Sequence, residues 1–409
     1  MGRVFRSTYH DTQDRRLGRS GLALRRRLEN GASTWEVELP EAPGQVALAA
    51  PGGPVRPPEL IADLLAAVVN ERALVEVLTV RTRRSDALVD EVSVIRNGTV
   101  VEEFVRDARD DDPGLDYLEA PQRPSLARTA PPRERIRARL QEQYEELLAH
   151  DPGVRLGREP EAVHKARVAV RRMRALLRSA RPMIDRAWAD QLRAELGWLG
   201  RSLGGVRDLD VLLLELRRLV DEFEGVDRAA GEQILVALSA QRAAARAQLE
   251  DVLAGGRYLM LLAMLEDAAR EPRWAGAERP VEELAGREFR KLRRAARGLG
   301  RDPSDEQLHR MRIRAKRARY AAEVAEPVVG KPARRVVERA REFQDLTGEH
   351  QDAVVAEQKL SALAGSGDAG VAFVAGRLAE RQRARRRGAR RRIGPAWKRL
   401  ERAGRKAWR

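Results

Sequence analysis

A basic stretch of eleven residues occurs twice in this chain, and this repeat constrains the fold more than any other feature. It begins at His164 and again, 145 positions later, at His309. In a helix, residues spaced alternately by three and four positions share one face. The basic residues with this spacing are His164, Arg167, Arg171, Arg174 and Arg178 in the first copy, and His309, Arg312, Lys316 and Arg319 in the second. The sequence therefore predicts two helices, each with one basic face.

Apolar side chains form a second stripe beside each basic face. They are Val163, Ala166, Val170, Met173 and Leu177 in the first copy, and Leu308, Met311, Ala315, Ala318 and Ala322 in the second. A stripe of this kind packs a helix onto its neighbours. Each basic face should therefore border a hydrophobic core instead of standing alone in solvent.

A run of charges on a helix is most often a solvated face, and this interpretation stays open for each copy taken by itself. However, the chain has only five histidines, and two of them occupy matching positions of the repeat. Like charges at these spacings destabilise a helix by about 0.2–0.5 kcal/mol per pair. Because the same cost occurs in both copies, we infer an anionic ligand that offsets it.

Both copies share the pattern His-x-x-Arg-[Val/Ile]-x-x-[Arg/Lys]-Arg-x-Arg, which resembles the conserved-histidine α-helical domain, CHAD. The resemblance covers roughly residues 131–405 and includes Leu203–Asp208, echoed by Thr347–Asp352 without the leucine and the arginine–aspartate dipeptide. It implies two pseudo-symmetric helical bundles with a basic cavity between them that binds inorganic polyphosphate.

Polyphosphate offers one negative charge per unit, so a binder needs many cationic donors in line. Arginine supplies a planar fork, lysine a compact charge, and histidine a donor whose charge follows pH. We expect contacts from His164, Arg167, Arg171, Arg174, His309, Arg312, Lys316 and Arg319. Arg172 and Arg317 lie one position off the basic faces and either join this set, as the resemblance implies, or pair with carboxylates. Arg178 and Arg201 are further candidates.

The net charge of +16 arises mostly from the C-terminal tail. Residues 377–409 hold 15 Arg or Lys against 2 Glu, a net charge of +13, which leaves +3 for the preceding 376 residues. The tail either completes the helical bundle, since Arg377, Arg381 and Arg385 share one face, or forms a solvated basic helix. In the second case it would bind nucleic acid without sequence preference, although an aromatic content of 4% argues against base stacking.

Several function classes lack their residues in this sequence. The absence of cysteine excludes disulfides and thiol chemistry and fits a reducing compartment. There is no Gly-x-x-x-x-Gly-Lys-Ser/Thr, His-Glu-x-x-His or Gly-x-Ser-x-Gly motif. Asp208 and Asp352 should begin helices or form ion pairs instead of binding metal. We expect a protein without catalytic residues, metal, cofactor or membrane partner, located in the cytoplasm, where polyphosphate granules are a candidate site.

Residues 1–106 predict a small α+β unit. Two β-hairpins are expected, one with its turn at residues 29–32 and one with its turn at Asn97-Gly98. A strand is expected at 74–81 and a helix near 59–70. Residues 40–58, rich in proline and glycine, are expected to form a loop. Arg25, Arg27, Arg81 and Arg83 alternate as a tunnel lining would, or else face solvent.

Tyr9–Thr12, Gly21–Arg27 and Trp35–Pro40 resemble the first half of a CYTH domain, the triphosphate-tunnel fold that often precedes CHAD. That family's catalysis requires an N-terminal Glu-x-Glu-x-Lys strand and later acidic strands. Here the first motif is absent, Glu38 replaces a usual lysine, and the residues after Phe104 run into aspartates and prolines. We expect a degenerate, non-catalytic unit; a metal-dependent triphosphatase would require a complete CYTH domain.

The sequence thus predicts a mainly α protein: a pseudo-two-fold duplicated helical bundle, preceded by an incomplete α+β domain that resembles half of a CYTH barrel. The expected domains are residues 1–106, a proline-rich linker at 107–133, and the CHAD-like domain at 134–405. From residue 133 onward the periodicity predicts about twelve helices in two sets of about six, with breaks near 204–208, 347–349 and 392–394.

Overall fold

The computed structural model describes residues 3–40, 44–85, 89–107, 118, 126–300, 302–365 and 368–408. The chain divides into two compact units. The first contains Met1–Ser125 and Tyr144–Ala169, and the second contains Leu126–Gln143 and Val170–Arg409. Two helices, α4 (Pro132–Leu156) and α5 (Pro160–Ser179), therefore have residues in both units. Most of the predicted linker, residues 108–117 and 119–125, lies outside the described residues.

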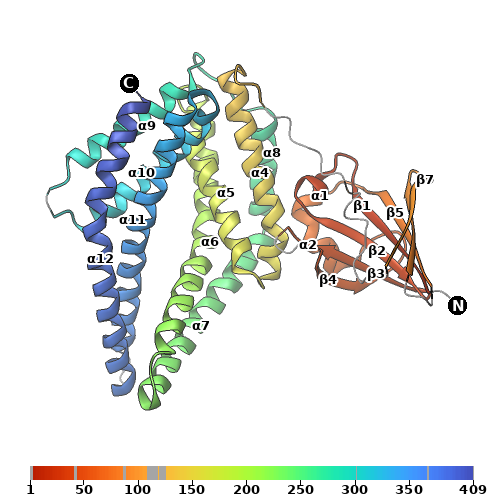
Figure 1. The fold of residues 1–409 in the computed structure, drawn as a ribbon, viewed down its shortest axis with the longest axis horizontal. Helices are drawn as coiled ribbons and strands as arrows, with labels where there is room; N and C mark the ends of the chain where they lie inside the picture. Colours follow the sequence, from red (N-terminus) through yellow and green to blue (C-terminus); the bar gives the residue numbers. More distant parts are fainter. Residues whose placement is uncertain are drawn as a thin grey trace. The chain divides into compact units, whose positions relative to one another are not determined.

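The first unit is built on an antiparallel sheet with the strand order β4-β3-β2-β1-β5-β6-β7 (Figure 1). Its described strands are β1 (Arg3–Thr12), β2 (Ala23–Glu29), β3 (Ala32–Glu38), β4 (Val46–Pro51), β5 (Leu74–Arg84), β6 (Val89–Arg96) and β7 (Thr99–Asp107). Helices α1 (Arg16–Arg19) and α2 (Glu59–Val69) accompany them.

Both predicted hairpins and the predicted helix α2 are confirmed. Asn30 and Asn97 have φ of 50°, and each is followed by a glycine with positive φ, which is the backbone that a two-residue hairpin turn requires. The loop prediction for residues 40–58 was wrong at β4, which pairs with β3 at the edge of the sheet. Edge strands tolerate proline and need no strict alternation of apolar residues, so sequence periodicity did not reveal it.

The strand register separates two pairs of arginines. Residues directly opposite each other on neighbouring strands share a face. Arg25 and Arg27 lie opposite Tyr9 and Ser7, whereas Arg81 and Arg83 lie opposite the alternate residues of β1. The four arginines therefore do not line one surface, which corrects the tunnel-lining interpretation.

Carboxylates neutralise two arginines of the sheet, Arg25 and Arg84. Arg25, 7% exposed, donates from Nε to Glu36 at 2.6 Å and lies 3.2 Å from Glu38. Glu38, the residue in place of the usual lysine, is thus a counter-ion inside the sheet. Asp90 is fully buried and accepts two hydrogen bonds from Arg84, at 2.8 and 3.1 Å.

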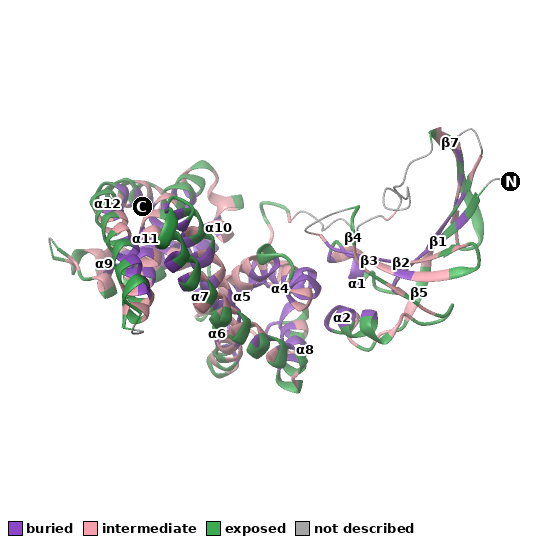
Figure 2. Ribbon diagram, turned by 90° about the horizontal axis from the view of Figure 1, so that it is seen from below, coloured by how far each residue is buried: buried purple, intermediate pink, exposed green. Residues whose placement is uncertain are grey.

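The second unit is helical. After its parts of α4 and α5, its helices are α6 (Arg186–Val220), α7 (Gly225–Ala254), α8 (Gly256–Arg270), α9 (Val281–Arg297), α10 (Asp305–Val329), α11 (Lys331–Ala364) and α12 (Ala369–Ala407). Helices α10, α11 and α12 pack in succession (Figure 1). Along them, buried residues form stripes opposite exposed ones (Figure 2).

The apolar stripes predicted for α5 and α10 are confirmed, because every one of their ten residues is at most 3% exposed. Helix α5 begins at Pro160, as expected, and Ser304 and Gln307 form the predicted capping box of α10. Pro327, expected just beyond α10, lies inside its last turn.

The prediction of about twelve helices was wrong, because the described residues from 126 onward form nine, α4 to α12. Helices α6, α11 and α12 each continue through an expected break. A glycine inside a helix costs only about 1 kcal/mol. Tertiary packing exceeds this cost: Leu203 and Val206 around the Gly204-Gly205 pair are 1% exposed.

The basic tail completes the bundle, which confirms the first of its two interpretations. Leu378, Ile393 and Leu400 of α12 are buried in the cores that α12 shares with neighbouring helices. The arginines that share one face of α12 pair with carboxylates of α6, of α7 and of the segment between these helices. The pairs are Arg377–Asp227, Arg381–Glu222 and Arg385–Glu215. None of the described helices is both long enough and apolar enough to cross a membrane.

Candidate functional site

Helices α5 and α10 meet around one tyrosine. Arg171 donates from Nε to the hydroxyl of Tyr320 at 2.8 Å. The guanidinium groups of Arg319 and Arg172 lie 4.8 and 5.8 Å from the centroid of the same ring, within the range of cation–π attraction. Tyr320 is 4% exposed, so it holds basic residues of both predicted helices against the core.

The two helices run in opposite directions at this contact. Arg172 approaches Glu323 at 3.8 Å, whereas Arg178, further along α5, is close enough to Arg317 for its charge to lower the Arg317 pKa. The residue numbers thus increase along α5 in the direction in which they decrease along α10. The basic residues of α10 and of the part of α5 that belongs to the second unit consequently form one region.

Burial and neighbouring positive charges lower the pKa of two arginines in this region. Burial, the largest cause, and the positive charges of Arg178, Arg314 and Arg193 together lower the pKa of Arg317 to about 10, while Glu288 acts in the opposite sense. The pKa of Arg174 is also lowered, first by burial and then by Arg193 and Arg201 of α6. Helix α6 therefore adds a third source of positive charge.

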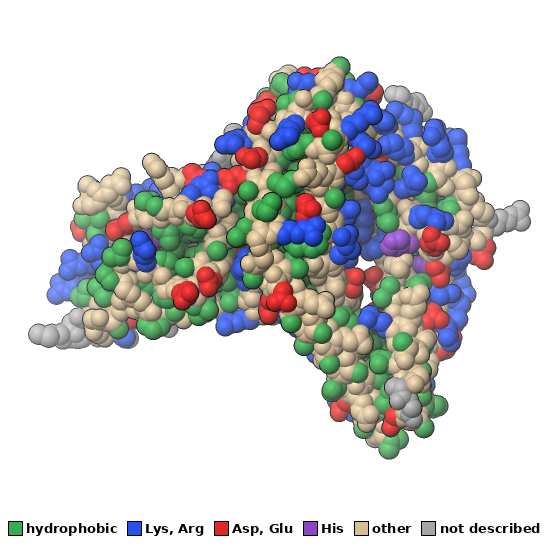
Figure 3. Space-filling view, turned by 180° about the vertical axis from the view of Figure 1, so that it is seen from behind, with side chains coloured by type: hydrophobic (Ala, Val, Ile, Leu, Met, Phe, Trp, Pro, Cys, Tyr) green, Lys and Arg blue, Asp and Glu red, His purple; other side chains and the backbone are tan. Residues whose placement is uncertain are grey.

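Most arginines in this region make no ion pair with a carboxylate anywhere in the described parts of the chain. They are Arg171, Arg174, Arg178, Arg201, Arg314 and Arg317. Arg377, Arg381 and Arg385 of α12 differ, because all three have acidic partners. Lys and Arg side chains gather over the side of the second unit where α9 to α12 lie, at the upper right of Figure 3, with histidine beside them. The region therefore carries a local excess of positive charge.

Two glycines let arginines lie directly against a neighbouring helix. A Cβ atom on Gly197 of α6 would stand 3.1 Å from Nη2 of Arg174, and one on Gly348 of α11 would stand 3.1 Å from Nη2 of Arg312. Such contacts are tighter than a methyl group normally makes. Glycine at these two positions leaves space for guanidinium groups beside the helix backbone.

Gln351 of α11 orients His309. The Nδ1 atom of His309 lies 3.0 Å from Oε1 of Gln351. Because an amide oxygen only accepts hydrogen bonds, Nδ1 is the donor, and Nε2 remains as the second polar atom of the ring. The imidazole is thus held in one orientation at the N-terminal end of the basic face of α10.

A family profile described as the CHAD domain matches residues 138–361, more than half of the chain. The chain belongs to the CHAD family. This match confirms the family that the repeated histidine-arginine motif predicted.

Relatives and solved structures extend the comparison. Two proteins of Mycobacterium tuberculosis strains, both named only as uncharacterized, are 28% identical to this chain over 98% of its length and 90% of theirs. The solved structure of PptA from Streptomyces chartreusis has a TM-score of 0.52 and 22% identity, covering 66% of this chain and all of that one, and thereby shows the same fold. The CHAD domain from the plant Ricinus communis has a TM-score of 0.49 and 27% identity over 70% of this chain and 96% of its own.

The remaining predicted residues of the CHAD domain lie as follows. Lys316 is half-buried on α10. His164 and Arg167, also half-buried, lie earlier on α5, in the part that belongs to the first unit. Arg172, which was expected either to join the basic set or to pair with a carboxylate, approaches Glu323. In the part of the chain that the structure describes, no group of three or more His, Asp or Glu side chains could hold a metal ion.

Asp208 and Asp352 lie inside α6 and α11, so the first of their two expected roles, the start of a helix, was wrong, and the ion pair stays a prediction. Burial raises the pKa of Asp352, and the carboxylates of Asp208 and Glu215 raise it further, whereas Arg312 and Arg385 lower it. The two aspartates are therefore close in space. Asp352 is a half-buried carboxylate beside an arginine of the basic face of α10.

Several residues of the region were not predicted from the sequence: Arg193, Arg314, Tyr320, Glu323 and Gln351. One signal was available for α6, where Arg193, Gly197 and Arg201 are spaced by four and share a face. Tyr320 and Glu323 carry no such signal, because their roles depend on partners on α5, about 150 residues away in sequence.

Proposed function

We propose that this protein binds inorganic polyphosphate along the basic faces of α5 and α10 without catalysing a reaction. The observation that carries the proposal is the set of arginines without acidic partners: Arg171, Arg174, Arg178, Arg201, Arg314 and Arg317. Three of these arginines, Arg171, Arg178 and Arg317, are half-buried. A folded protein that crowds cations in this way loses stability unless a ligand neutralises them. A linear polyanion supplies several charges along one line.

The dimensions of α5 suit such a ligand. From His164 to Arg178 the helix advances about 21 Å at roughly 1.5 Å per residue, enough for several phosphates. Guanidinium groups bind phosphate oxygens through two parallel hydrogen bonds, and Nε2 of His309 supplies a donor when protonated. We assign the first contacts to His164, Arg167, Arg171, Arg174, His309, Arg312, Lys316 and Arg319, with Arg172, Arg178, Arg201 and Arg317 at the border of the site.

The same proposal includes the internal duplication and the division of the chain into domains. We infer that the CHAD part, residues 134–405, is an internal duplication in which α10 corresponds to α5. Residues 1–106 form a degenerate CYTH-like unit in which Glu36, Glu38 and Asp90 already neutralise Arg25 and Arg84, which argues against a triphosphate ligand there. Residues 107–133 join the two parts. A cytoplasmic location, with association with polyphosphate granules, follows if the ligand is polyphosphate.

A titration with polyphosphate of defined length tests the proposal. The double variant Arg171→Glu, Lys316→Glu should bind about a hundredfold more weakly, since each charged hydrogen bond contributes about 1.5 kcal/mol. The matched control is Arg270→Glu, Arg279→Glu, which changes the net charge equally at two exposed arginines. Equal losses in both variants would mean that binding is non-specific attraction.

Salt and competition complete the test. The affinity should fall with rising ionic strength, because a polyanion that contacts several arginines releases counter-ions. A salt-independent affinity would contradict phosphate contacts. Duplex DNA or RNA at equal phosphate concentration should not displace polyphosphate; if it does, non-specific nucleic-acid binding is the better description.

A further inference from the structure

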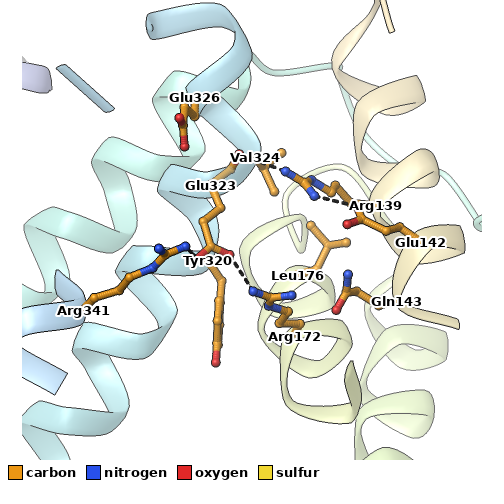
Figure 4. Close-up of a pocket in the computed structure, with 10 residues that line it drawn as sticks. All are labelled: Arg139, Glu142, Gln143, Arg172, Leu176, Tyr320, Glu323, Val324, Glu326 and Arg341. Atoms are coloured by element: carbon orange, nitrogen blue, oxygen red, sulfur yellow. Dashed lines mark hydrogen bonds and ion pairs between the residues drawn. The ribbon is translucent and has the colours of Figure 1, made fainter. Parts of the chain in front are cut away.

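Glu323 of α10 lies among arginines from three helices. Its carboxylate oxygens are 3.6 Å from Nε of Arg319, 3.8 Å from Arg172 of α5 and 3.9 Å from Arg341 of α11. The side chain of Glu323 is 15% exposed. Figure 4 shows Arg172 and Arg341 reaching toward it from opposite sides. One negative charge is thus shared by three positive ones.

None of these three contacts has the length of a hydrogen bond. The buried atoms Oε1 of Glu323, Nε of Arg172 and Nε of Arg319 have no hydrogen-bond partner among the described residues. The same chain forms a close pair elsewhere, since Arg84 donates twice to Asp90 at 2.8 and 3.1 Å. Glu323 therefore balances the charge of its arginines without satisfying their hydrogen-bonding groups.

Space for another group lies next to this carboxylate. A pocket of about 250 Å³ is lined by Arg139, Glu142, Gln143, Arg172, Leu176, Tyr320, Glu323, Val324, Glu326 and Arg341. Gln143 is 4% exposed, and its buried Oε1 has no partner in the described structure. The pocket also reaches Tyr320, whose hydroxyl accepts a hydrogen bond from Arg171. It therefore adjoins the basic region of α5 and α10.

We propose that Glu323 is an internal counter-ion that a phosphate group of the ligand displaces from Arg172, Arg319 and Arg341. This inference rests on the proposed function and adds a specificity-determining residue to it. Successive phosphate groups of the ligand together offer more oxygens and more charge than one carboxylate, so they satisfy the donors that Glu323 leaves unsatisfied. Weakly charged anions do not displace Glu323. The Glu323 carboxylate thereby lowers the affinity of the site for anions in general and favours ligands of high charge.

The variant Glu323→Gln tests this role in the full chain. We expect it to bind polyphosphate about fivefold more tightly than the wild type, the effect of removing one competing ion pair of ordinary strength. The matched control is Glu326→Gln on the next turn of α10. Glu326 also lines the pocket but pairs with Arg334, at 2.9 Å, outside the arginine cluster. The affinity of the Glu326→Gln variant for polyphosphate should change by less than about twofold.

A second variant separates displacement from the change in net charge. Glu323→Asp keeps the charge and withdraws the carboxylate by one methylene group, so it should also tighten binding, and it remains informative if Glu323→Gln fails to fold. Thermal unfolding of each variant checks the fold. One outcome separates the two proposals: the wild type binds polyphosphate, the double variant Arg171→Glu, Lys316→Glu binds it more weakly, and neither Glu323 variant binds it more tightly. The counter-ion role of Glu323 is then wrong, while the proposed function stands. If the wild type does not bind polyphosphate, both fail.

Discussion

Replacing Arg317 by methionine should stabilise the folded protein and weaken polyphosphate binding at the same time. Methionine keeps an unbranched apolar stem and removes the guanidinium group. In the folded protein, burial and the charges of Arg178, Arg314 and Arg193 lower the Arg317 pKa from its ordinary value to about 10. The charged form therefore costs stability at every pH below about 10, and the cost decreases only above that pH.

The lowered pKa fixes the size of the effect. The decrease of the Arg317 pKa from its ordinary value to about 10 corresponds to an upper limit of about 3 kcal/mol, at about 1.4 kcal/mol for each pKa unit. Water screens a half-buried guanidinium, so we expect the free energy of unfolding of Arg317→Met to rise by about 1 kcal/mol at neutral pH. The melting temperature should rise by about 2–4 °C.

Urea unfolding and a polyphosphate titration measure the two effects. The control is Arg310→Met, on the same helix, because Arg310 is exposed and pairs with Glu306 at 2.6 Å. That variant should be slightly less stable than the wild type and bind equally well. The reasoning is refuted if Arg317→Met is less stable than Arg310→Met, or if it binds polyphosphate as tightly as the wild type.

Two further substitutions probe the neighbourhood of Arg312. Asp352→Asn should remove part of the loss of stability that the wild type shows as pH rises through the raised pKa of this carboxyl group, because the charged form is unfavourable above that pKa. Unfolding at several pH values measures this effect, and a steeper loss in the variant would contradict it. Gly348→Ala should displace the Arg312 guanidinium and weaken binding about threefold. Gly205→Ala, where the added methyl meets only Ala245 at 3.9 Å, should leave binding unchanged.

Local sequence determined the amphipathic character of the two basic helices. The apolar stripes of α5 and α10 are buried as their spacing required, because helical periodicity alone decides which residues share a face. The capping box at Ser304 and the turns at Asn30 and Asn97 also follow from neighbouring residues only. The family resemblance came from the same source, since its motif lies on a single helix in each copy.

Tertiary structure alone decided where helices end and which arginines keep acidic partners. Helix α6 continues through Gly204-Gly205 because packing on both sides outweighs the local preference to end. Arg385 has a glutamate on α6, whereas Arg317 faces Arg178 of α5. The two arginines look alike in sequence, and the difference between them depends on side chains more than a hundred residues away. Helical periodicity places a charge on a face, but only the packing of distant helices determines what that face meets.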